Sequence, residues 1–192
     1  MAPSDEAELT RVVATAAAFD EGPSAFRYPR GEGTGCSIPD TPGLLEIGKG
    51  RIVREGEKLA ILSLGTRLQD ALLAADQLDQ AGASITVADA RFAKPLDTAL
   101  IDRLWRDHDG IILIEEGSAG GFAAHVMQYL ANRGQLDNGK MLRALTLPDR
   151  MIDHDSQLGQ LADAGLDSAG IIAVAAPMLG VDPAGVINAL QG

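Results

Sequence analysis

The sequence predicts a three-layer α/β fold with a mainly parallel sheet, preceded by a lone helix–strand segment and a linker. Strands and helices alternate from residue 59 onward, an order that favours a parallel sheet with helices on both faces. The strand expected at 59–64 is continuously apolar, as in a strand buried on both faces. Hydrophobic residues make up 46% of the chain but aromatic residues only 4%, so we expect an aliphatic core.

The first 43 residues resemble the end of a larger domain rather than a domain of their own. A helix is predicted over 4–19, with Ser4 as N-cap, and Gly22-Pro23 ends it before a short strand at 24–28. Residues 31–43 contain four glycines and two prolines and are interpreted as a linker. We therefore divide the chain into a domain tail with linker, 1–43, and a second domain, 44–192.

The second domain is expected to begin with a hairpin at 45–53 and to continue as alternating elements. The helices are predicted from apolar residues that recur every three or four positions, as Leu68, Leu72, Ala75 and Leu78 do. Strands are predicted at 59–64, 84–88, 111–115 and 142–146, and helices at 67–81, 97–107, 120–133, 156–164 and 168–179. Residues 180–192 are expected to add one short helix and a frayed tail.

Charge and composition exclude some classes of function. The net charge of −11 is unfavourable for binding nucleic acid or an anionic membrane. Cys36 is the single cysteine, so an internal disulfide is impossible and a reducing cytoplasm is expected. No apolar run approaches the length of a membrane span, and Asp5 and Glu6 do not fit a signal peptide. We expect a cytoplasmic protein with no nucleic-acid or membrane partner.

The strongest candidate site residue is Arg30, in the run Phe26-Arg27-Tyr28-Pro29-Arg30-Gly31. Pro29 biases Tyr28 toward extended backbone and ends the strand, which places Arg30 at the carboxyl end of that strand. Ligands of α/β proteins bind at this edge, and a guanidinium can donate two parallel hydrogen bonds to a phosphate or carboxylate. The alternative is a surface arginine after a turn.

The second domain offers weaker candidates. Glu115-Glu116-Gly117 lies between a strand and a helix, where an anion could bind, but two carboxylates would repel a phosphate and a structural turn fits better. Lys94, before Pro95, could pair with Glu115 or Glu116 or stay solvated. Asp97 is expected to cap the next helix, with Thr98 as its competitor.

The histidines and loop aspartates do not form a recognisable metal motif. His108, His125 and His154 lack the spacing of a metal pair. Asp149, Asp153 and Asp155 could contact a cation but lack the order of an EF-hand loop. No general acid, base or nucleophile stands out, which indicates that the chain does not complete an active site alone.

Several motifs together resemble the 1-deoxy-D-xylulose-5-phosphate synthase family across nearly the whole chain. They are Met1-Ala2-Pro3-Ser4-Asp5-Glu6, the run from Gly22 to Gly31, Ile47-Gly48-Lys49-Gly50, Ala90 to Asp97, Glu115-Glu116-Gly117, Leu147-Pro148-Asp149 and Gly165 to Ile171. The family condenses pyruvate with glyceraldehyde 3-phosphate, releases CO2, and feeds isoprenoid, thiamine and pyridoxal synthesis. The resemblance implies that 1–43 ends the pyrimidine-binding domain and that the remainder is a transketolase C-terminal domain.

The resemblance also defines what this chain lacks. Members use thiamine diphosphate and Mg²⁺ and work as homodimers, but the family's magnesium and diphosphate motif, its cofactor-activating glutamate and its active-site histidines have no counterpart here. We therefore expect no bound cofactor and no catalytic residue in this chain. The implied substrate contact is Arg30, at the phosphate of glyceraldehyde 3-phosphate, with Arg27 as a neighbouring candidate.

Three hypotheses remain open at the level of sequence. The chain is a part of the synthase that is inactive alone, or a non-catalytic assembly module that acts in trans with a partner carrying the missing domains. The third is the C-terminal piece of the beta component of an E1-type 2-oxo acid dehydrogenase.

Overall fold

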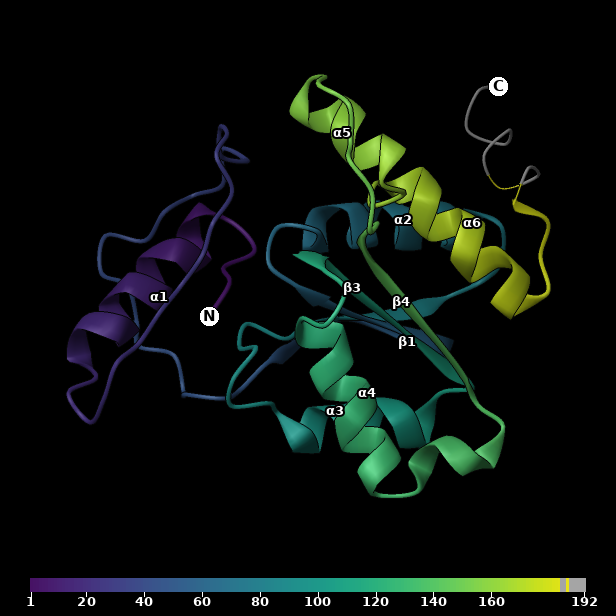
Figure 1. Cartoon of the computed structure of the whole chain (residues 1–192), viewed down its shortest axis with the longest axis horizontal. Helices are drawn as coiled ribbons and strands as arrows, with labels where there is room; N and C mark the ends of the chain where they lie inside the picture. Colours follow the sequence, from purple (N-terminus) through teal and green to yellow (C-terminus); the bar gives the residue numbers. More distant parts are fainter. Residues whose placement is uncertain (184–185, 187–192) are drawn as a thin grey trace.

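The computed structural model describes residues 1–183 and 186, and its centre is a four-stranded sheet of order β2-β1-β3-β4 (Figure 1). One face carries α2, α5 and α6, and the other carries α3 and α4 (Figure 1). These layers confirm the predicted α/β fold class. The strands are β1 Arg51–Leu64, β2 Ile85–Asp89, β3 Gly110–Ser118 and β4 Met141–Leu147. The helices are α1 Glu6–Ala18, α2 Leu68–Gln80, α3 Thr98–Asp107, α4 Phe122–Asn132, the 3-10 helix Gln135–Asn138, α5 Gln157–Asp163 and α6 Ser168–Leu179.

Alternation along β1 divides an aliphatic core between the two faces of the sheet. Leu59 and Ile61 pack in the cluster beneath α2 and α6, while Ala60 and Leu62 pack in the cluster beneath α3 and α4. Successive side chains of a strand point to opposite faces, so one apolar strand can serve both layers. The predicted aliphatic core is confirmed.

The N-terminal half of β1 pairs with β2 in a register that sequence reasoning missed. From Leu59 to Ser63 the pairing with β2 is regular and parallel. From Arg51 to Glu57, in contrast, each later residue of β1 pairs with an earlier residue of β2. The two registers meet near Gly56, whose amide donates to Thr86 Oγ1 at 2.9 Å. A Cβ at Gly56 would overlap the backbone of Ile85, so only glycine fits there.

The hairpin predicted at 45–53 is wrong. Ile47 and Gly48 form a turn, closed by a 3.1 Å hydrogen bond from Lys49 N to Glu46 O, but no strand precedes it. Residues from Arg51 onward find their partner in β2 instead, about thirty to forty residues later in the sequence. The hydrogen bonds that a local hairpin would have used are therefore supplied by a distant strand.

The segment Gln157–Leu179 is apolar enough by length and composition to cross a membrane, with a mean hydropathy of 1.3. This corrects the expectation that no apolar run approaches that length. A turn with Gly165 at φ +68 divides the segment into α5 and α6. Buried residues of α6, including Ile171 and Ile172, pack in the core cluster beneath α2, and 33% of the apolar window is buried.

The N-terminal segment lies beside the sheet, with α1 at one side of the molecule (Figure 1). Asp5 caps α1, accepting a 2.8 Å hydrogen bond from Glu8 N, so the predicted cap at Ser4 is wrong by one residue. The predicted strand at 24–28 is absent as a strand. Instead, the Met1 amino group donates to Ala25 O at 2.8 Å, and Arg27 N donates to Met1 O at 3.1 Å.

These two bonds are the pattern of a parallel bridge in which Met1 faces Phe26. Ala2 N also donates to Arg91 O at 2.9 Å, so residues 1–2 lie between the extended segment and the sheet domain. The strand does not form because residues 1–2 are too short a partner to build a ladder. The helix expected within 180–192 falls largely outside the described residues.

Candidate functional site

Arg27 and Arg30 lie on one extended segment but have different surroundings. Arg27 Nη2 donates to Glu115 Oε2 at 3.2 Å, while half of the arginine side chain remains exposed. Arg30 is exposed, and it makes no hydrogen bond or ion pair within the part of the chain that the structure describes. Arg27 therefore has a structural partner, whereas the Arg30 guanidinium is available to a ligand.

Arg30 lines a cavity of about 590 Å³ between the N-terminal segment and helices α2 and α5. Arg67 also lines it and pairs with Asp70 at 2.8 Å, and burial raises the pKa of Asp70 despite this pairing. Leu158 and Leu161 supply an apolar wall. The cavity could hold an anionic group at Arg30 with the rest of a small molecule against this wall.

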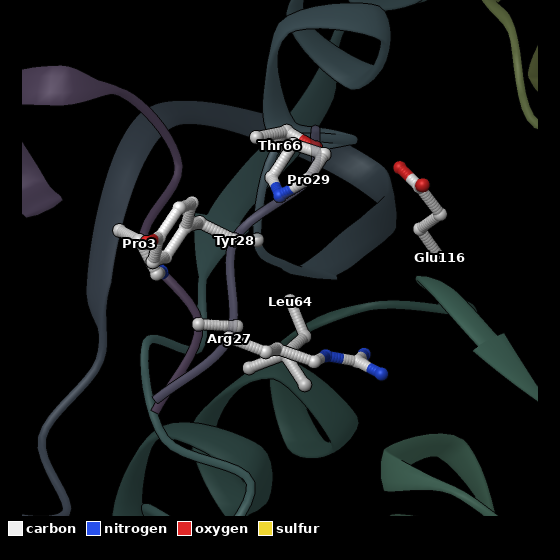
Figure 2. A pocket seen from close by; sticks show the side chains of 9 residues that line it. Pro3, Arg27, Tyr28, Pro29, Leu64, Thr66 and Glu116 are labelled. Atoms are coloured by element: carbon white, nitrogen blue, oxygen red, sulfur yellow. The ribbon is translucent and has the colours of Figure 1, made fainter. Parts of the chain in front are cut away.

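A second pocket of about 100 Å³ lies at the carboxyl end of β1 (Figure 2). Figure 2 shows Arg27, Leu64, Thr66 and Glu116 around it. Glu116 Oε2 lies 3.5 Å from Arg67 Nε, but the geometry is not that of a hydrogen bond and both atoms are buried without a hydrogen-bond partner. This pocket thus joins Arg27 to the carboxyl ends of β1 and β3, the edge where α/β proteins bind ligands.

Glu115-Glu116-Gly117 lies within β3 rather than in a turn, and Glu115 has the structural role that the better of the two interpretations predicted. Glu115 is buried, and its Oε1 accepts a 2.9 Å hydrogen bond from Ala123 N at the start of α4. Gly117 and Gly121 leave room for this carboxylate, because a Cβ at either would meet its oxygens. The anion position at the N-terminus of α4 is therefore filled by the protein itself.

A buried ion network attaches α1 to the sheet domain. Glu8, 3% exposed, accepts two hydrogen bonds from Arg91, from Nε at 2.8 Å and from Nη2 at 2.9 Å. Arg51 Nη1 lies 3.3 Å from Glu8, and Arg51 Nη2 lies 3.3 Å from Asp89 Oδ2. Arg91 adopts φ 56, a left-handed conformation that non-glycine residues rarely adopt, and its amide donates to Asp89 Oδ1 at 3.1 Å.

Sequence reasoning missed this network, although two signals were present. Asp89 is a charged residue at the end of a fully buried strand, and Arg91 follows it within the Ala90–Asp97 motif. Buried charges are almost always paired, so Asp89 indicated an arginine partner nearby. No local pattern pointed to Glu8, which lies more than eighty residues earlier than Arg91 in the sequence.

Burial raises the pKa of Asp89 to about 6, with Arg51 and the Arg91 amide opposing the rise. Asp89 Oδ2 accepts no hydrogen bond, although Arg51 lies within ion-pair distance. A pKa raised in the folded state means that the folded protein holds this proton more tightly than the unfolded chain. The stabilising contribution of Asp89 is therefore complete below pH 4 and is lost as the pH rises through 6.

We expect the free energy of unfolding of the wild type, relative to that of Asp89→Asn, to fall by roughly 2.5 kcal/mol between pH 4 and pH 8. Asparagine cannot ionise, so the variant lacks this part of the pH dependence. Urea unfolding of both proteins over this pH range measures the difference directly. A difference that stays constant with pH would contradict the assignment.

Lys94 and the histidines are placed differently from the sequence expectations. Lys94 does not pair with Glu115 or Glu116, whose ionic partners are Arg27 and Arg67. His108 is buried, with Nδ1 2.9 Å from Leu104 O and Nε2 2.7 Å from Thr86 Oγ1, and so links α3 to β2.

His125 and His154 make no comparable contacts with the part of the chain that the structure describes. His125 lies on α4 beside a cavity, and His154 is exposed in the loop after β4. Among the described residues no three His, Cys, Asp or Glu side chains form a group that could hold a metal ion. Asp97 caps α3 through a 3.0 Å bond from Leu100 N, as predicted, so the alternative cap at Thr98 is not used.

Comparison with known proteins identifies the family of the sheet domain. Residues 48–171 match the model of the transketolase C-terminal domain. The chain is also similar to a solved structure described as "Split gene transketolase, inactive beta4 tetramer", with a TM-score of 0.78 and 24% identity. That match covers 94% of this chain but only 57% of the solved chain, so this chain spans little more than half the length of that relative. The chain belongs to the family of transketolase C-terminal domains.

Proposed function

We propose that this chain is the C-terminal part of a thiamine-diphosphate-dependent synthase of the 1-deoxy-D-xylulose-5-phosphate synthase type. The whole enzyme would condense pyruvate with glyceraldehyde 3-phosphate and release CO2. The family of the sheet domain supports a transketolase-like enzyme. The observation that carries the finer proposal is Arg30, in the Phe26–Gly31 run, unpaired among the described residues and on the wall of the 590 Å³ cavity.

Arg30 is proposed to bind the phosphate of glyceraldehyde 3-phosphate. Its planar guanidinium can donate two parallel hydrogen bonds to phosphate oxygens, and no protein carboxylate competes for it in the described residues. Arg27 is proposed as a secondary contact. Its Nη2 is engaged by Glu115, and the exposed half of its side chain leaves other donors for a substrate.

We further propose that this chain does not act alone. Within the described residues, the extended segment around Phe26 is paired only on the side of Met1, and Phe26 and Tyr28 are exposed and stacked with ring centroids 6.3 Å apart. Strands of parallel sheets are normally paired and covered by helices. A partner polypeptide that carries the rest of the pyrimidine-binding domain and the N-terminal domain would supply the missing strand and the covering helices. This chain and its partner together would form one complete enzyme subunit, and two such subunits would form the homodimer.

The cofactor is assigned to that partner. The resembled family uses thiamine diphosphate and Mg²⁺, and no group of three His, Cys, Asp or Glu side chains among the described residues could hold a metal ion. The N-terminus of α4, which could otherwise hold a diphosphate, is occupied by Glu115. We therefore propose no cofactor contact for the described residues of this chain.

The Arg30 assignment is tested in the complete enzyme. Arg30→Ala should raise the KM for glyceraldehyde 3-phosphate roughly tenfold to a hundredfold while the KM for pyruvate changes little, because a charge-assisted contact contributes about 1.5–3 kcal/mol. Steady-state kinetics with each substrate varied in turn measures both constants. Arg143→Ala is the matched control, because Arg143 is exposed on β4 and bonds only to the neighbouring Leu142 carbonyl among the described residues. Equal rises for both substrates would refute the phosphate role.

A further inference from the structure

Two adjoining hollows form one groove along α4, outside the Arg30 cavity. The first, of about 510 Å³, and the second, of about 230 Å³, share Ala93, Lys94 and His125 as lining residues. The groove lies between the 93–96 segment and α4, and we call it the α4 groove. None of its lining residues lines the Arg30 cavity, but Arg27, the proposed secondary substrate contact, lines the edge of the first hollow.

The α4 groove is locally positive in an acidic chain. Lys94 is exposed, and neither its ammonium group nor the His125 ring makes a hydrogen bond or ion pair within the described residues. The only carboxylate in the lining is Glu115, among the residues that the structure describes, and its two oxygens are already engaged by Arg27 and Ala123 N. A net charge of −11 makes this unneutralised site unusual on the protein.

The two ends of the groove differ in polarity. Phe26, Leu64 and Phe122 line the end near the carboxyl edge of β1. Gln128 and Asn132 line the other end, on successive turns of α4. Lys94 and His125 stand between the two ends, because both belong to each hollow. A ligand with one charged group and a short apolar body could therefore reach Lys94, His125 and the apolar wall together.

We propose that the α4 groove binds a small monocarboxylate, with its carboxylate at Lys94 and His125 and its apolar chain toward Leu64 and Phe122. Of the cations that line the groove, Arg27 is paired with Glu115 and the Met1 amino group is bonded to Ala25 O, so the Lys94 ammonium group is the one without a partner among the described residues. One such group neutralises a single negative charge, which favours a carboxylate over a phosphate dianion. The imidazole adds a hydrogen bond to the second carboxylate oxygen. The groove lies at the carboxyl ends of the parallel strands, the edge where ligands bind in this class of fold.

The test is a titration of the 192-residue chain with butyrate, acetate and inorganic phosphate, followed by the backbone amide NMR signals of residues 122–132. Butyrate should shift these signals saturably and bind on the order of tenfold more tightly than acetate, since each buried CH2 contributes about fourfold. Lys94→Gln and His125→Gln should each weaken binding by about tenfold or more. Both side chains are at least partly exposed, so the variants should fold normally.

Matched controls separate this site from general charge effects. Lys58→Gln removes an exposed lysine just before Leu59, far from the carboxyl end of β1, and His154→Gln removes an exposed histidine in the loop after β4. Both controls, and Arg30→Ala, should bind butyrate as the wild type does. The proposal is overturned if butyrate gives no saturable shift, if Lys94→Gln binds as well as Lys58→Gln, or if phosphate binds more tightly than butyrate.

Discussion

Replacing Glu8 with alanine should lower the free energy of unfolding by about 3–5 kcal/mol. Glu8 accepts both Arg91 hydrogen bonds and lies beside Arg51, and its own side chain is almost fully buried. Removing it leaves the guanidinium of Arg91, itself only 13% exposed, without a carboxylate partner. An unpaired buried charge costs far more than the pair contributes, so the loss should be much larger than for a surface ion pair.

Chemical unfolding of the variant measures this loss, and Glu55→Ala provides the matched control. Glu55 pairs with Arg103 at 2.8 Å, but both side chains are about half exposed or more, so its removal should cost less than about 1 kcal/mol. Hydrogen exchange should also rise throughout 1–18 in the Glu8 variant, because the network attaches α1 to the sheet domain. A similar loss of unfolding free energy in both variants would mean that Glu8 does not hold α1 against the sheet domain.

Replacing Gly56 with alanine should destabilise the protein by about 3 kcal/mol. The new Cβ would overlap the carbonyl group and Cα of Ile85, and these are backbone atoms within the sheet. Relief requires moving β1 away from β2 at the point where their register changes. The bond from Gly56 N to Thr86 Oγ1 would be lost with that movement.

Gly43→Ala is the control for the Gly56 substitution. A Cβ at Gly43 meets nothing within 4 Å, and the residue has no positive φ, so its stability should stay within about 0.5 kcal/mol of wild type. Urea unfolding of the two variants side by side gives the comparison. Equal stability of both variants would show that the close approach of Gly56 to Ile85 is not maintained in solution.

Sequence periodicity predicted the sheet domain because its elements are determined by local patterns. The helix at 67–81 and the strand at 84–88 differ from α2 and β2 only at their ends, since apolar spacing and buried runs are strong signals. The first half of β1 was missed because its residues alternate between exposed and partly buried and pair with a distant strand. The strand at 24–28 was overpredicted because a β-prone sequence needs a partner strand to form a ladder.

The candidate site was only partly predictable for a related reason. Glu115 was correctly interpreted as structural, because adjacent carboxylates argue against phosphate at that position, although residues 115–117 lie in β3 and not in a turn. The partner of Arg27 could not be inferred, since Glu115 is 88 residues away in the sequence. The Glu8–Arg91 contact was invisible for the same reason, and the roles of Arg30 and Arg27 toward a substrate stay predictions.

The most direct test of the central claim is product formation from pyruvate and glyceraldehyde 3-phosphate, with thiamine diphosphate and Mg²⁺ present. The purified chain is assayed alone and after co-expression with a polypeptide that carries the N-terminal domain and the rest of the pyrimidine-binding domain. We expect no 1-deoxy-D-xylulose 5-phosphate from the chain alone, and synthesis by a co-purifying complex. Product from the chain alone, or a complex that assembles and binds cofactor yet makes no product, would contradict this account.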